Sequence, residues 1–194
     1  MPDLASVSAG TAYALLAVLV LAESGILLGF FLPGDTVLLA AGLLSGPRGV
    51  LSLPVLLAVV LAAAVSGDAL GYATGRRAGP ALFGRRAGRV LNPQTLARAS
   101  AFYLRYGALA VIAARWIPWV RTFTPLMAGA ARMPYGRFLL ANVTGAVTWG
   151  ATLLVLGHLA ARAPGLRSGA SYVAVGVVLV AGALAVRQTR RSRR

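Results

Sequence analysis

Residues 23–44 read ESGILLGFFLPGDTVLLAAGLL, an apolar run with one acid at its start and a second acid directly after a proline–glycine pair. A helix needs roughly 20 apolar residues to cross a bilayer, and Pro33 and Gly34 divide this run into pieces that are too short. Broken backbone at membrane depth is tolerated only where protein or a water-filled cavity surrounds it. The stretch therefore predicts a re-entrant helical hairpin over about residues 24–45, preceded by a first helix over residues 6–22.

The composition of the whole chain indicates a lipid environment. Of the 194 residues, 58% are hydrophobic, and the mean hydropathy is +0.78, values above those of ordinary soluble domains. The chain has no cysteine and one histidine, His158, so it cannot form a disulfide or a His-rich metal centre. We predict an all-α, polytopic membrane protein that forms a single membrane domain over residues 1–194, without metal or cofactor.

Three further apolar segments predict continuous transmembrane helices, at residues 51–75, 138–161 and 169–186. The first has a single charge, Asp68, and its closely spaced glycines let a neighbouring helix approach; they are Gly67, Gly71, Gly75 and Gly79. The last is followed by a basic tail, residues 187–194.

Between the first two spans lie an amphipathic segment and a second interrupted apolar run. Residues 80–105 place arginines on one side of a helical wheel and apolar residues on the other, which predicts a basic segment along the membrane surface. Asn92 and Pro93 predict a helix start within it. Residues 107–131 predict a second re-entrant hairpin, because Pro118 and Pro125 interrupt them.

The distribution of arginine predicts the topology. The positive-inside rule places residues 80–105 and the C-terminus in the cytoplasm, in a multi-pass protein of the inner (plasma) membrane. The two hairpins then enter the bilayer from opposite faces. We therefore expect two inverted repeats, residues 6–79 and 106–162, each with a re-entrant hairpin and a transmembrane helix. Transporters built in this way bind substrate at the repeat interface, near the midplane.

Four charged residues in or beside the hairpins are costly there, and they are Glu23, Asp35, Arg115 and Arg121. Each costs roughly 2.5 to 3.5 kcal/mol at the centre of a lipid-exposed helix. They must therefore pair, face a cavity or change protonation state, and we expect the acids of one repeat to pair with the arginines of the other. One interpretation is that the ion pairs only hold the hairpins together. The other is a functional site, the usual role of intramembrane ionisable groups.

The chemistry of these groups indicates a division of roles. Arginine presents a planar fork of donors that suits phosphate, so we predict that Arg115 and Arg121 bind an anionic headgroup. A low dielectric disfavours the charged form of a carboxylate, so we predict that Glu23 and Asp35 take up and release protons.

Three further residues are secondary candidates. We expect Asp68 to snorkel or to pair with an arginine near the cytoplasmic end of its span. Trp116 and Trp119 flank the second hairpin break, where they could line its cavity. By contrast, Trp149 is interpreted as packing, and Asn142 as a donor of interhelical hydrogen bonds.

Several short motifs occur in an order that resembles the DedA family of membrane proteins, also called VTT-domain proteins. They are ESG at 23–25, FLPGD at 31–35, GDALGY at 67–72, RWIP at 115–118, RTF at 121–123, PLMAG at 125–129 and MPY at 133–135, with Phe138 and Asn142. The resemblance covers nearly the whole chain. It implies a transporter with two opposed re-entrant hairpins that moves a lipid phosphate, undecaprenyl phosphate in bacterial members, with proton dependence in some. The family's functional acids and arginines fall on Glu23, Asp35, Arg115 and Arg121, and Asp35 stands where many members have glutamate.

We therefore expect a transporter, not an enzyme, that translocates a lipid phosphate and is coupled to protons. Its expected partners are the bilayer, anionic lipid headgroups and the lipid-phosphate substrate, and homo-oligomer formation stays open. Nucleic acid is not expected, although the formal charge is +15, because the arginines gather between apolar runs. The alternatives are a general phospholipid scramblase, a proton-coupled cation or drug antiporter, and a structural membrane organiser. A lipid-phosphate phosphatase is disfavoured because His158 has no partner histidine.

Overall fold

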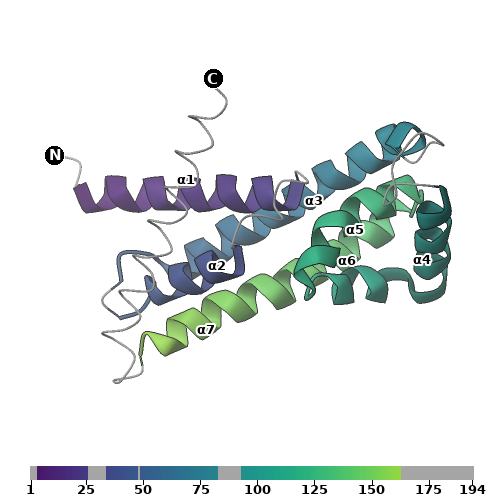
Figure 1. Ribbon diagram of the computed structural model, residues 1–194. Helices are drawn as coiled ribbons and strands as arrows, with labels where there is room; N and C mark the ends of the chain where they lie inside the picture. The colour runs from purple at the N-terminus through teal and green to yellow at the C-terminus, as the bar shows by residue number, and fades with distance from the viewer. Residues whose placement is uncertain (1–3, 26–33, 48, 83–92, 163–194) are drawn as a thin grey trace. The chain divides into compact units, whose positions relative to one another are not determined.

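The computed structural model describes residues 4–25, 34–47, 49–82 and 93–162 (Figure 1). The expected span 169–186 and the basic tail 187–194 lie outside the described residues, as do Pro33, Asn92 and the middle of the amphipathic segment. The described residues form helices and no strand, which confirms the all-α prediction. The helices are α1 (Leu4–Gly25), α2 (Gly34–Leu43), α3 (Leu53–Leu82), α4 (Pro93–Ala114), α5 (Pro118–Ala130), α6 (Tyr135–Ala146), a π-helical turn (Val147–Ala151) and α7 (Thr152–Ala160).

Two stretches of the described chain are long and apolar enough to cross a membrane. They are Leu53–Gly79, with 27 residues, and Tyr135–Ala160, with 26 residues. They overlap the expected spans 51–75 and 138–161. The second is not a regular α-helix throughout, because the π-helical turn Val147–Ala151 joins α6 to α7.

The boundaries of the first two helices partly match the expected hairpin. Helix α2 begins at Gly34, so this second residue of the expected break is the first residue of the helix. Helix α1, however, ends at Gly25, beyond the expected end at residue 22, so Ser24 belongs to its last turn. The helix continues there because Gly25 packs closely against Gly67 of α3, where a Cβ atom on Gly25 would lie 3.2 Å from the Gly67 carbonyl oxygen. The re-entrant path of the chain and the inverted repeat stay predictions.

The chain forms two compact units, and both expected repeats contribute to each of them. Of the described residues, the first unit contains 4–16, 34–47, 49–59 and 150–162, and the second contains 17–25, 60–82 and 93–149. In the first unit α2 packs along α7 (Figure 1). Gly42 and Gly157 make this approach possible, because a Cβ atom on either would lie 2.3 Å from a carbonyl oxygen of the other helix.

In the second unit, the expected second hairpin is a helix–turn–helix. Gly107 has a non-helical backbone (φ 55°, ψ −132°) that divides α4, so its second part runs over residues 108–114. That part ends in a tight turn closed by hydrogen bonds from the amides of residues 115, 116 and 117 to carbonyls three residues earlier. Helix α5 then starts at Pro118, the break predicted from the sequence, and packs against α4.

Pro125 was predicted to be a second break in this hairpin, and that prediction is wrong. Helix α5 continues through Pro125 to Ala130. Proline removes only one helical amide, and its ring needs space on the neighbouring side. Gly71 of α3 provides that space, since a Cβ atom there would lie 3.1 Å from Cβ of Pro125.

Close packing of α3 against α5 holds the second unit together and confirms the expected role of the α3 glycines. A Cβ atom on Gly75 would lie 2.0 Å from the carbonyl oxygen of Leu126, and one on Gly79 would lie 3.0 Å from Cβ of Ala130. Tyr72 of α3 stacks on the fully buried ring of Phe138 at 4.7 Å between centroids, and its hydroxyl donates to the carbonyl of Met133. This core fixes α3, α4, α5 and α6 around the charged residues.

Candidate functional site

Two ion pairs with buried carboxylates lie in the second unit. Arg115, in the turn after α4, donates from Nη1 to Oδ2 of Asp68 on α3. Arg121, in the first turn of α5, donates from Nη2 to Oε1 of Glu23 on α1. Only 5% of Glu23 and 4% of Asp68 is exposed, so both carboxylates are removed from solvent by the packing of the helices. The turn between α4 and α5 therefore presents one arginine on each side of the break, each to a different acid.

Asn142 of α6 completes the surroundings of Arg115. Its Oδ1 accepts a hydrogen bond of 2.9 Å from Nη1 of Arg115, and its Nδ2 donates to the carbonyl of Val65 on α3 at 3.3 Å. Asn142 thus makes the interhelical hydrogen bonds predicted from the sequence. Gly145, one turn further along α6, leaves room for the arginine, because a Cβ atom there would lie 3.1 Å from Cδ of Arg115.

Trp149, in the π-helical turn, contacts both arginines. The guanidinium carbon of Arg115 lies 5.3 Å from the centre of its ring, and that of Arg121 lies 4.8 Å from it. Both distances are within the range of cation–π attraction. From the sequence, only packing was expected of Trp149, so this role is new. The available signal was spacing, since Asn142, Gly145 and Trp149 recur at three and four residues and share a helix face.

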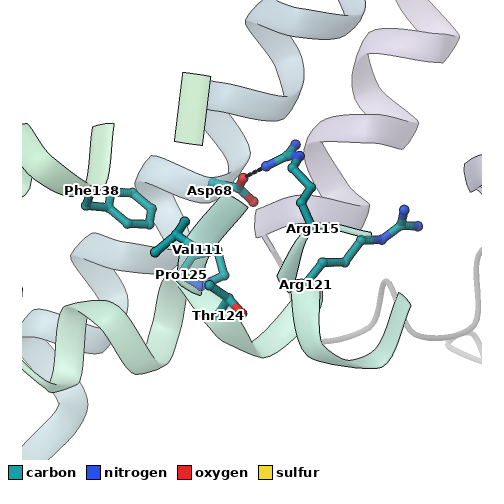
Figure 2. Close-up of a pocket in the computed structure, with 7 residues that line it drawn as sticks. All are labelled: Asp68, Val111, Arg115, Arg121, Thr124, Pro125 and Phe138. Carbon is teal, nitrogen blue, oxygen red and sulfur yellow. Dashed lines mark hydrogen bonds and ion pairs between the residues drawn. The ribbon is translucent and has the colours of Figure 1, made fainter. Parts of the chain in front are cut away.

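A small cavity lies between these side chains. It is lined by Asp68, Val111, Arg115, Arg121, Thr124, Pro125 and Phe138 (Figure 2). The volume open to the centre of a water molecule is about 10 Å³, which is room for a single water. One donor at the site, Nε of Arg115, is buried and has no hydrogen-bond partner among the residues that the structure describes. A buried donor of this kind favours any ligand that brings an acceptor.

The cavity wall at Thr124 is fixed from two sides. The Thr124 hydroxyl donates to the carbonyl of Val120 at 2.7 Å, and its backbone carbonyl accepts from the hydroxyl of Tyr103 on α4 at 3.4 Å. Burial raises the pKa of Tyr103, so its hydroxyl keeps its proton and remains a donor.

The structure brings together three of the four residues singled out from the sequence. Glu23, Arg115 and Arg121 lie in the second unit, while Asp35 lies in the first turn of α2, in the first unit. Asp68 was expected to pair with an arginine near the end of its own span or to snorkel, and that expectation is wrong. Its partner is Arg115, in the turn between α4 and α5.

The structure describes the side chain of only one of the two tryptophans that were proposed as secondary candidates. Half of the Trp116 side chain is exposed, and this residue is not part of the cavity lining. Trp119 lies in the first turn of α5, and its side chain is outside the described part of the structure. Among the described residues no group of three or more potential metal ligands occurs.

Comparison with known proteins identifies the family. The VTT domain profile matches residues 32–159. Protein DedA of Escherichia coli K12 is 32% identical over 169 residues, which cover 87% of this chain and 77% of DedA. An uncharacterized membrane protein of Mycobacterium leprae is 34% identical over 163 residues, covering 84% of this chain and 72% of that protein. An uncharacterized membrane protein of Mycobacterium tuberculosis is 35% identical over 164 residues, with the same two shares.

No solved structure matches the chain. The match of the domain profile over most of the sequence, together with relatives above 30% identity, shows that this chain belongs to the VTT-domain (DedA) family of membrane proteins.

Proposed function

We propose that this protein translocates a lipid phosphate across the plasma membrane, with undecaprenyl phosphate as its substrate and protons as the coupling ion. The observation that carries the proposal is that Arg115 and Arg121 line one cavity and that each is neutralised by its own buried carboxylate. A phosphate group offers several acceptor oxygens and negative charge, so it can take the place of both carboxylates.

Two further features favour an anion at this place. Helix α5 begins at Pro118, three residues before Arg121, and the N-terminal end of a helix carries partial positive charge. Arg115 also holds a buried Nε donor with no partner among the described residues. A phosphate oxygen would satisfy this donor without any change in the Asn142 hydrogen bond.

The size of the cavity requires the ion pairs to open during transport. Space for about one water is too small for a phosphate group. Phosphate therefore enters only when the carboxylates withdraw from the guanidinium groups. The acyl chain stays in lipid in this scheme, and only the headgroup passes through the site.

Protonation of the acids explains why the carboxyl groups would move away from the guanidinium groups. A neutral carboxylic acid attracts a guanidinium group far less than a carboxylate does, so a proton on Glu23 releases Arg121. The same reasoning assigns a coupling role to Asp35, although it lies on α2 in the other unit. Proton uptake then favours phosphate binding, and proton release favours the closed ion pairs.

The proposal includes the membrane arrangement expected from the sequence. The hairpins at residues 24–45 and 107–131 enter the bilayer from opposite faces, the C-terminus is cytoplasmic, and surface arginines contact anionic headgroups. An antiporter for cations is less compatible with the site, because each described buried acid already has an arginine as its partner.

The test is translocation of undecaprenyl phosphate by purified protein in vesicles. The variants Arg115→Gln and Arg121→Gln should each abolish transport, while Arg98→Gln, a change of an exposed arginine on α4, should leave the rate unchanged. Soluble alkyl phosphates should compete. Movement of ordinary phospholipids but not of undecaprenyl phosphate would instead identify a general scramblase, and cation movement that survives both changes would identify an antiporter.

A further inference from the structure

Within the described part of the chain, the Trp149 side chain lies against both arginines of the site. Its ring is 5% exposed, and the two guanidinium carbons lie 5.3 Å and 4.8 Å from its centre. It belongs to neither hairpin and comes from the π-helical turn that follows α6. A single indole therefore contacts two cations that bond to different acids on different helices.

The two kinds of contact use different parts of each guanidinium group. Hydrogen bonds to Asp68 and Glu23 leave from Nη atoms, which point outward in the guanidinium plane. A cation–π contact depends instead on the attraction of the cation to the electron-rich ring. Replacement of a carboxylate by a phosphate changes the first contact and leaves the second in place.

The local backbone explains how Trp149 reaches this position. A π-helical turn adds a residue to the helical repeat and is common at functional sites. The hydroxyl of Thr148 donates to the carbonyls of Thr144 and Gly145, at 3.0 and 3.1 Å, where the hydrogen-bond pattern of the helix changes. Gly145 also admits the Arg115 side chain. The turn and the glycine together let the indole and the guanidinium of Arg115 meet beside Asn142.

We propose that Trp149 is a positioning residue of a phosphate-monoester site, where its indole keeps the guanidinium groups of Arg115 and Arg121 together while phosphate replaces Asp68 and Glu23. This inference rests on the proposed function and adds a third member to the site. Without the indole, two like charges freed from their acids would repel each other and separate. The phosphate would then bind one arginine in place of two.

The test is calorimetry on the full-length protein in detergent, which measures the binding of two probes. Dodecyl phosphate represents a lipid phosphate, and inorganic phosphate represents phosphate without an alkyl chain. In the free protein the acids hold both arginines, so the indole is needed only when phosphate has replaced them. Trp149→Leu should therefore raise the Kd by roughly 10- to 30-fold, the range that a desolvated cation–π contact corresponds to. Trp149→Phe keeps an aromatic face and should remain within about threefold of the wild type. Phe102→Leu, which removes an exposed aromatic ring on α4, is the matched control and should have no effect.

A spectroscopic measurement separates positioning from packing. The chain has three tryptophans, so Trp149 is the only one left in the Trp116→Phe, Trp119→Phe variant. Its emission should change on addition of dodecyl phosphate, with the half-saturation found by calorimetry. This measurement tests the role of Trp149 even if Trp149→Leu does not fold, because unchanged emission at saturating dodecyl phosphate would contradict that role.

The outcomes distinguish the two proposals. Wild-type affinity in a folded Trp149→Leu variant, or a Trp149→Phe variant as weak as Trp149→Leu, would overturn the role of Trp149 and leave the proposed function intact. No binding of either probe to the wild type would overturn both. Equal binding of inorganic phosphate and dodecyl phosphate, each weakened roughly 10- to 30-fold by Trp149→Leu, would support the role of Trp149 and overturn the assignment of the site to a lipid headgroup.

Discussion

Arg121 and Glu23 are hydrogen-bonded to each other although 98 residues separate them in the chain. The last turn of α1 supplies the acid, and the first turn of α5 supplies the base. A second pair, Arg115 with Asp68, lies beside the same cavity. The site thus has four charges that sum to zero, and any anion that enters must change that balance.

The first prediction concerns pH. If protonation of Glu23 releases Arg121, transport by the wild type should become faster as pH falls through the range in which Glu23 takes up its proton. Glu23→Gln imitates the protonated acid permanently, so its rate should depend less on pH. The measurement is the initial rate of lipid translocation in vesicles across a pH series. Full rate and an unchanged pH profile in a Glu23→Gln, Asp35→Asn double variant would rule out the coupling role of these acids.

The second prediction is a double-mutant cycle on the other pair. Removing one partner of a buried ion pair leaves an uncompensated charge and costs about 3–5 kcal/mol, so Asp68→Asn and Arg115→Gln should each destabilise strongly. The double variant should lose less than the sum of the single losses, because neither charge is left alone. Thermal unfolding in detergent gives the comparison. Additive losses would mean that the two groups do not interact.

The third prediction tests the contact between α3 and α5. A Cβ atom on Gly75 would lie 2.0 Å from a backbone oxygen, which cannot move aside as a flexible side chain can. Gly75→Ala should therefore lower the free energy of unfolding by about 1–3 kcal/mol, the usual cost of overpacking. Gly136→Ala on α6 is the control, since no atom lies within 4 Å of the added carbon. Equal melting temperatures of the two variants would contradict this packing.

The fourth prediction concerns the first unit, where Ser45 follows α2 and His158 lies on α7. The Ser45 hydroxyl donates to the carbonyl of Gly42 at 2.7 Å, and its oxygen lies 3.0 Å from Nδ1 of His158. A hydroxyl has one proton to donate, so Nδ1 must carry the other proton and donate to the serine. His158 is the single histidine, so ¹⁵N NMR can assign its protonated nitrogen without ambiguity. A neutral ring protonated at Nε2 alone would contradict this arrangement, and Ser45→Ala should remove the preference for Nδ1.

The charged residues could be identified from the sequence because a charge in an apolar segment is costly wherever the helix packs. This cost identifies Glu23, Arg115 and Arg121 as candidate site residues from the sequence alone. It could not identify the partner of Arg115, since Asp68 lies 47 positions earlier in the sequence and meets it only in the folded protein. The spacing of Trp149 from Asn142 and Gly145 was equally visible, but its contact with two arginines also depends on a π-helical turn, which the sequence did not predict.

The helix breaks show the same limit. Pro118 stops a helix by local rules alone, and α5 starts there. Pro125 obeys the same rules in isolation, yet it lies inside α5, because a glycine on another helix leaves space for its ring. The residue types along the chain therefore predict where a helix can end, and contacts with other helices determine at which of these positions it ends.

The central claim is that the arginines bind phosphate, in contrast to serving only as structural ion pairs. Exchange of the partners, Arg121→Glu combined with Glu23→Arg, keeps one positive and one negative charge at the same two positions and so can preserve the pair. The account predicts that this variant keeps a melting temperature near that of the wild type but loses translocation of undecaprenyl phosphate in vesicles, since the cation has left the turn beside Arg115. Transport at the wild-type rate by the exchanged variant would contradict the account.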